Sequence, residues 1–167
     1  MTVVVSDTSP LNYLVMIGEI AILHRLYDKV LVPAEVLAEL QDDGAPSEVL
    51  QWVRSQPDWL EVRRAVIHRD ETALNQLGEG ECAAILLAQR ESGVLLIIDD
   101  AAGRAEANRR DIPNTGTLGV LRAAAIRGFV DLPTTLARLA ATNFRASKSL
   151  LDDLLAEYFE QKRHLDV

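Results

Sequence analysis

Acidic residues in four separate segments of the chain are placed where they could build one metal-dependent site. Each lies near the end of an expected strand or in a helix that begins there. They are Asp7, Glu39, one of Glu79 and Glu81, and one of Asp99 and Asp100. Converging carboxylates repel one another, so a shared site would need cations. Oxygen ligands without histidine or thiolate select Mg²⁺ or Mn²⁺ over zinc, and such ions promote the attack of water on phosphorus.

The segment around Asp7 has the clearest pattern. Residues 3–5 are all valine, a β-branched run that is typical of a central parallel strand buried on both faces. Ser9 is expected to cap the following helix, with Pro10 as its first residue. Asp7 then lies at the carboxyl end of a core strand, where ligands bind in open α/β sheets. The alternative is that Asp7 itself merely caps the helix.

The remaining acids belong to a regular alternation of strands and helices. The spacing predicts strands at residues 30–32, 59–62 and 94–98, and a short edge strand at 112–114. Pro33 is expected to open the helix that carries Glu39, and residues 82–89 are expected to form a buried helix. Residues 64–76 are weakly patterned and are expected to form a loop. The alternation predicts an α/β fold, a three-layer α/β/α sandwich around a mostly parallel sheet.

Two pairs of acids leave the register of the site open. Glu79 and Glu81 are two residues apart, so in a helix they cannot face the same way, and both also suit the helix dipole without any other role. Asp99 and Asp100 are adjacent, so both cannot point to one side of a regular strand.

The composition excludes several other kinds of site. Cys82 is the only cysteine among 167 residues, which rules out an internal disulfide, and its apolar neighbours suggest a buried thiol. The three histidines lack the spacing of a zinc site. No apolar run approaches the roughly 20 residues that span a membrane, so a cytoplasmic protein is expected. The formal charge of −8 argues against a nucleic-acid partner, but bound divalent cations would present positive charge to phosphate.

We expect one domain over residues 1–167 that ends in an amphipathic helix at about 147–163. Leucine and aromatic residues recur there at helical spacing and form one wide apolar stripe. The stripe either packs on its own domain or contributes to a surface for a second copy or another partner.

Five short motifs occur in a fixed order between about residues 3 and 128. They are Asp7-Thr8-Ser9-Pro10-Leu11, Val32-Pro33 with Val36 and Glu39-Leu40, Gly78-Glu79-Gly80-Glu81-Cys82-Ala83-Ala84-Ile85, Ile97-Ile98-Asp99-Asp100 with Gly103-Arg104, and Gly116-Thr117-Leu118-Gly119. In this order they resemble PIN-domain proteins. The likeness is greatest to the VapC-like group, the toxins of bacterial and archaeal toxin-antitoxin pairs.

The resemblance implies a PIN-like fold and an endoribonuclease that depends on Mg²⁺ or Mn²⁺. Asp7 matches the first acid of the family, Glu39 the second, and Glu81 the third, where many members have aspartate. The fourth is Asp99 or Asp100, and we favour Asp100 as the match just beyond the strand. These five side chains are the candidate metal ligands, and all except Asp99 are the candidate catalytic residues. The resemblance further implies an RNA substrate, a small antitoxin that blocks the acidic cleft, and a homodimer.

Other functions fit the sequence less well. A catalytically inactive PIN module that binds RNA or a protein partner is the main alternative, although an acid is retained at all four places. A receiver-type domain would need a lysine at a late strand end, and a dinucleotide-binding fold would need G-x-G-x-x-G after the first strand. Thr8, Ser9 and Thr117 either contact phosphate or water in the site or only cap helices. Arg104 either contacts phosphate or is simply solvated.

Overall fold

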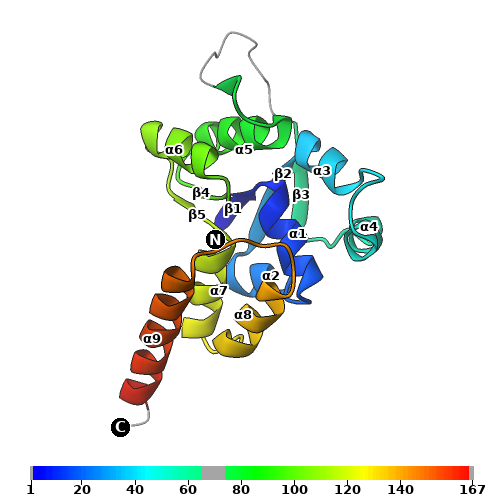
Figure 1. Cartoon of the computed structure of the whole chain (residues 1–167). Coiled ribbons are helices and arrows are strands. Elements are labelled where there is room, and N and C mark those ends of the chain that lie inside the picture. Colours follow the sequence, from blue (N-terminus) through cyan, green and yellow to red (C-terminus); the bar gives the residue numbers. More distant parts are fainter. Residues whose placement is uncertain (1, 65–73, 166–167) are drawn as a thin grey trace. The chain divides into compact units, whose positions relative to one another are not determined.

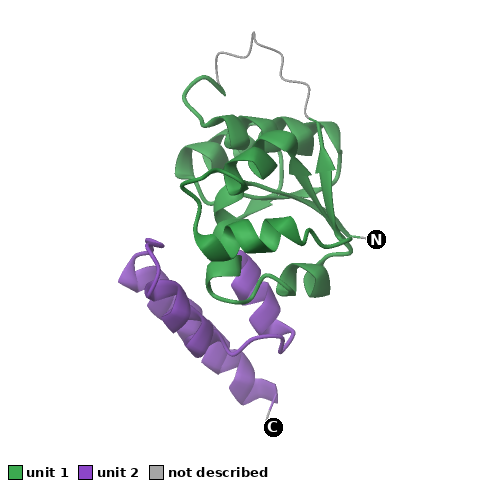
Figure 2. Cartoon of the chain, turned by 90° about the vertical axis from the view of Figure 1, so that its right-hand side faces the viewer, with its two compact units in different colours: residues 1–117 green, residues 118–167 purple. Residues whose placement is uncertain are grey.

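The structure is a computed structural model that describes residues 2–64 and 74–165 (Figure 1). Most of the loop expected at residues 64–76 therefore lies outside the described residues. The chain divides into two compact units, Met1–Thr117 (unit 1) and Leu118–Val167 (unit 2), coloured green and purple in Figure 2. The single domain expected over residues 1–167 stays a prediction.

Unit 1 is built on a parallel sheet of five strands in the order β3-β2-β1-β4-β5 (Figure 1). Every neighbouring pair runs parallel. The strands are β1 (Val3–Ser6), β2 (Lys29–Pro33), β3 (Leu60–Arg63), β4 (Leu95–Ile97) and β5 (Asn114–Thr115). The predicted α/β fold with a parallel central sheet is confirmed, and β5 is an edge strand that pairs with β4 alone.

Both faces of the sheet are covered. Val5, Leu31 and Leu96 belong to a buried cluster that also contains residues of two helices, among them Ala84 and Ala107. Strand alternation turns the neighbouring side chains to the opposite face. Those neighbours, such as Val4 and Val30, are also fully buried, which is why valine runs mark these strands in the sequence.

Six helices of unit 1 connect or flank these strands in the described part of the chain. They are α1 (Thr8–Met16), α2 (Ile22–Leu26), α3 (Ala34–Leu40), α4 (Ser47–Arg54), α5 (Glu79–Arg90) and α6 (Ala101–Arg109). The first helix begins earlier than predicted. Asp7, not Ser9, occupies the cap position, and Pro10 lies in the first turn without being its first residue. A proline fits anywhere in that turn, because the first N–H groups of a helix have no partner within the helix.

Unit 2 consists of helices. They are α7, which begins at the last residue of unit 1 (Thr117–Ile126), α8 (Leu132–Ala140) and α9 (Lys148–Leu165). Gly128, with a φ of 70°, follows α7 in the left-handed conformation that favours glycine after a helix. The C-terminal helix predicted at about residues 147–163 is present as α9. The Arg122 guanidinium of α7 donates a hydrogen bond to the Glu157 carboxylate of α9. Tyr158 is buried, whereas Phe159 is 50% exposed. None of the described helices is long and apolar enough to cross a membrane.

Candidate metal centre

The predicted site residues follow strands whose carboxyl ends meet at one edge of the sheet. Asp7 comes directly after β1, and its backbone N–H donates to the Ile97 carbonyl at the end of β4 (2.9 Å). Asp99 lies two residues beyond that strand. Glu39 belongs to α3, which follows β2, and Glu81 belongs to the first turn of α5. Parallel pairing of β2, β1 and β4 therefore brings segments far apart in sequence to the same edge.

Asp7 is a buried carboxylate without a complete set of partners. Asp7 is 3% exposed, its side chain makes no capping hydrogen bond to α1, and its Oδ1 is buried without a hydrogen-bond partner among the described residues. Burial raises the pKa of Asp7 to about 7, against the effect of the Thr8 N–H, and the charges of Glu81, Glu39 and Asp99 raise this pKa further. Capping therefore does not explain this residue, and a buried acceptor without a partner is costly. Glu81, Glu39 and Asp99 therefore all act electrostatically on Asp7.

Glu39 is held toward Asp7 by two donors. The Thr8 hydroxyl donates to Glu39 Oε2, and the Gly80 N–H donates to Glu39 Oε1 (3.0 Å). A Cβ at position 80 would lie 2.5 Å from Glu39 Oε2. Only glycine lets α5 approach this carboxylate so closely, and because Glu39 is 41 positions away, the sequence motif that contains Gly80 does not reveal this contact.

Glu81, and not Glu79, is the acid at the start of α5 whose charge acts on Asp7. Its Oε2 accepts a hydrogen bond from the Gly78 N–H (3.1 Å), which ties it to the start of α5. Burial raises the pKa of Glu81, the Gly78 N–H opposes this effect, and the charges of Asp100 and Glu39 add to it. Glu79 is exposed and is not among the charges that raise the pKa of Asp7. The geometry thus agrees with the choice of Glu81, whose role in catalysis stays a prediction.

Asp99 and Asp100 have different local roles. The Thr117 N–H donates to Asp99 Oδ1 and the Thr117 hydroxyl to Asp99 Oδ2, both at 2.7 Å. Gly116 leaves room for this approach, since a Cβ there would lie 2.7 Å from Asp99 Oδ1. Asp100 is exposed and caps α6 by accepting from the Gly103 N–H (2.8 Å).

Of these two acids, only Asp99 is among the charges that act on Asp7. Its charge raises the pKa of Asp7, whereas that of Asp100 raises the pKa of Glu81. Asp99 is therefore the candidate fourth acid that acts on Asp7, and Asp100, which the sequence favours, is the candidate that acts on Glu81. The catalytic assignment of either residue stays a prediction.

The donor set suits a hard divalent cation. All candidate ligands are carboxylate oxygens, the chemistry that Mg²⁺ and Mn²⁺ prefer. Within residues 2–64 and 74–165, no three acidic, histidine or cysteine side chains are already arranged to hold an ion. These side chains do not face a common point because four of the carboxylates accept hydrogen bonds from backbone N–H groups. The four are Glu39, Glu81, Asp99 and Asp100. The unpartnered Asp7 Oδ1 is the atom that an ion would satisfy, so the residues present fit such an ion once the surrounding carboxylates rotate.

Comparison with known proteins identifies the family. No curated protein sequence matches the chain significantly. A family model described as a PIN domain matches residues 3–160. That range extends from β1 into α9 and includes every candidate acid. The PIN domain is a nuclease fold whose members commonly use divalent metal ions. Because the match covers nearly the whole sequence, the chain belongs to the PIN-domain family.

Proposed function

We propose that the protein is an endoribonuclease that hydrolyses RNA phosphodiester bonds with Mg²⁺ or Mn²⁺. The observation that carries the proposal is Asp7 Oδ1, a buried carboxylate oxygen at the carboxyl end of the central strand that has no hydrogen-bond partner within residues 2–64 and 74–165. A buried acid that has one oxygen without a partner and is not needed as a cap indicates a functional group more strongly than a structural one.

The residues of the chain would have two kinds of role, metal binding and the positioning of metal ligands. Asp7 would hold the cation through Oδ1. Glu39, Glu81 and Asp99 would be the other carboxylate ligands, and Asp100 is a further candidate ligand. A divalent ion held by these carboxylates would supply neutralisation of charge on the phosphate and activation of water as a nucleophile. Thr8 and Thr117 orient Glu39 and Asp99 by donating hydrogen bonds, which makes them positioning residues.

Arg104 is the candidate phosphate contact. It is exposed on α6 beside Asp99, since the point that a Cβ of Gly116 would occupy is 2.7 Å from Asp99 Oδ1 and 3.8 Å from Arg104 Nη1. In the described part of the chain it forms no ion pair with that carboxylate. A guanidinium at the rim of an acidic site is suited to bind a phosphate oxygen that approaches the site.

The resemblance to VapC-like proteins supports a more specific proposal. The protein would be the toxin of a type II toxin-antitoxin pair, act on cytoplasmic RNA and form a homodimer. A small antitoxin with a basic side chain would block the acidic cleft, in line with electrostatic complementarity.

The test is cleavage of a mixed structured and single-stranded RNA by purified protein in Mn²⁺ or Mg²⁺, with EDTA as the metal-free control. Asp7→Asn should abolish cleavage, whereas the exposed Asp58→Asn, an identical change away from the site, should not. Equal cleavage by the Asp7→Asn variant would contradict the proposal.

One observation favours a second candidate, a PIN module that binds RNA or a protein without cutting. No three candidate ligands in the described segments are already arranged around an ion. Folded, partner-free protein that binds RNA but cuts it in neither metal would favour this candidate.

A further inference from the structure

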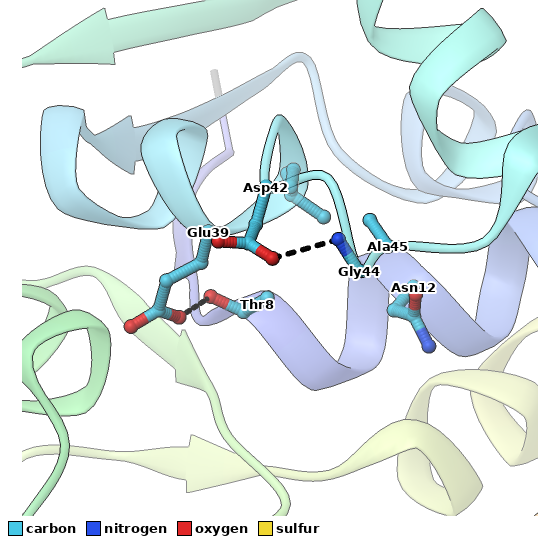
Figure 3. Close-up of a pocket in the computed structure, with 7 residues that line it drawn as sticks. Thr8, Asn12, Glu39, Asp42, Gly44 and Ala45 are labelled. Carbon is cyan, nitrogen blue, oxygen red and sulfur yellow. Dashed lines mark hydrogen bonds between the residues drawn. The ribbon is translucent and has the colours of Figure 1, made fainter.

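A hollow of about 340 Å³ borders the candidate metal centre, between α1 and the segment that follows α3. Figure 3 shows Thr8 and Glu39 together at one end and Asn12 with Gly44 and Ala45 at the other. The hollow therefore shares two residues with the acidic site and extends from it along α1. Its volume lies within the range of about 300–1,000 Å³ that is usual for small-molecule sites.

Two polar side chains in this hollow have hydrogen-bonding capacity that the fold does not use. Asn12 is half-buried in α1, and its side chain has no hydrogen bond to any described residue, although asparagine is a weak helix former. Asp42 Oδ1 accepts from the Gly44 N–H (2.8 Å), which leaves Oδ2 available as an acceptor. Asn12 offers both a donor and an acceptor, whereas Asp42 offers only an acceptor.

The charge and the walls of the hollow limit what can enter. Glu39 and Asp42 disfavour a phosphate group there, because like charges repel. Leu40 and Ala45 provide apolar surface. A planar heterocycle with polar edges satisfies both conditions, and nucleobases in single-stranded RNA are read by such edge contacts.

We propose that this hollow is a nucleobase subsite for the nucleotide next to the scissile phosphate, an inference that rests on the proposed ribonuclease function. Asp42 accepts a hydrogen bond from an exocyclic amino group of the base, and Asn12 bonds to the adjacent ring edge. Uracil lacks an amino group, and its N3–H donor lies between two carbonyl oxygens that the Asp42 carboxylate repels, so its contact with Asp42 is weaker than that of an amino group. The subsite therefore selects cytosine or another amino-bearing base over uracil.

The experiment compares binding of two fluorescent single-stranded probes, oligocytidylate and oligouridylate of equal length, in Ca²⁺ with intact RNA verified by gel. Wild-type protein should bind the cytidylate more tightly. Asp42→Asn, which keeps the acceptor for the Gly44 N–H, and Asn12→Ala should each reduce this preference about tenfold, within the discrimination of one good base contact. Asp43→Asn is the matched control, because the neighbouring acid does not line the hollow, and it should keep the preference.

The same variants are then used to cut a random-sequence RNA in Mn²⁺, and the bases beside the cuts are counted. An altered base preference with cleavage retained supports the subsite. The subsite proposal would be overturned if the wild-type protein showed no base preference, or if the Asp42→Asn and Asn12→Ala variants kept the wild-type preference. Either result is expected if the hollow binds a basic side chain of a protein partner instead. Absence of cleavage with an altered binding preference would refute the nuclease proposal but not the subsite, so the two failures are distinguishable.

Discussion

Replacing Asp7 by asparagine should stabilise the metal-free protein at alkaline pH while it abolishes activity. The burial of Asp7 and its three acidic neighbours raise its pKa from the ordinary 3.8 to about 7. At pH 8 the native state must therefore hold a charge that its surroundings disfavour, whereas the unfolded chain releases the proton at no such cost. An uncharged amide of the same shape removes this penalty.

The size of the effect follows from the pKa. At about 1.4 kcal/mol per pKa unit, the rise from 3.8 to about 7 corresponds to at most about 4 kcal/mol. Between about pH 4 and pH 7 the native state binds more protons than the unfolded state, so this contribution to wild-type stability falls as the pH rises through the folded pKa. The gain of Asp7→Asn over wild type should thus be small at pH 4 and approach its maximum at pH 8.

Urea unfolding in EDTA at pH 4 and pH 8 measures this difference, with the exposed Asp58→Asn as the control that should match wild type at both. Adding Mn²⁺ at pH 8 should stabilise the wild-type protein but not the Asp7→Asn variant, because an ion that binds only the native state raises its stability. An Asp7→Asn variant that is no more stable than wild type at pH 8 would refute the reasoning about the buried charge.

Three further changes test other parts of the structure. Gly80→Ala would place a Cβ 2.5 Å from Glu39 Oε2, so the flexible carboxylate must move; we expect a stability loss below about 1 kcal/mol by urea unfolding but a large loss of RNA cleavage. Glu106→Gln should destabilise the protein by about 1–2 kcal/mol at pH 7, because two arginines hold the pKa of this buried carboxylate below its usual range; the difference from wild type should vanish as the pH falls through that lowered pKa. Arg104→Gln should weaken RNA binding and lower the salt dependence by about 0.7 in log–log slope, whereas Arg90→Gln, at the far end of α5 from the site, should leave the slope unchanged.

The sequence allowed the sheet and the place of Asp7 to be predicted because both depend on local patterns. The valine run of β1 and the apolar run of β4 are buried on both faces, so hydrophobicity alone marks where these strands end. The strand expected at residues 112–114 lies slightly later, at Asn114–Thr115, because Pro113 has no N–H and contributes only its carbonyl, which accepts from the Leu96 N–H (2.8 Å).

The details of the site could not be predicted, because they depend on contacts between distant residues. The bonds from Gly80 to Glu39 and from Thr117 to Asp99 join positions 41 and 18 residues apart. Periodicity shows which face of a helix or strand is buried, but not which side chains meet across loops. The choice between Asp99 and Asp100 depends on where β4 stops: it ends at Ile97, so Asp100 becomes the cap of α6 and Asp99 is left for Thr117.

The strand order also has a consequence for the protein during its synthesis. β1 lies between β2 and β4, so the first three strands can pair as β3-β2-β1 before β4 has been made. A nascent chain that has emerged only as far as α5 carries Asp7, Glu39 and Glu81 but not the acid that follows β4. Domains fold while the ribosome is still adding residues. If the protein is the ribonuclease proposed above, a nascent chain would lack its fourth carboxylate, and with it a complete acidic site, until β4 has left the ribosome.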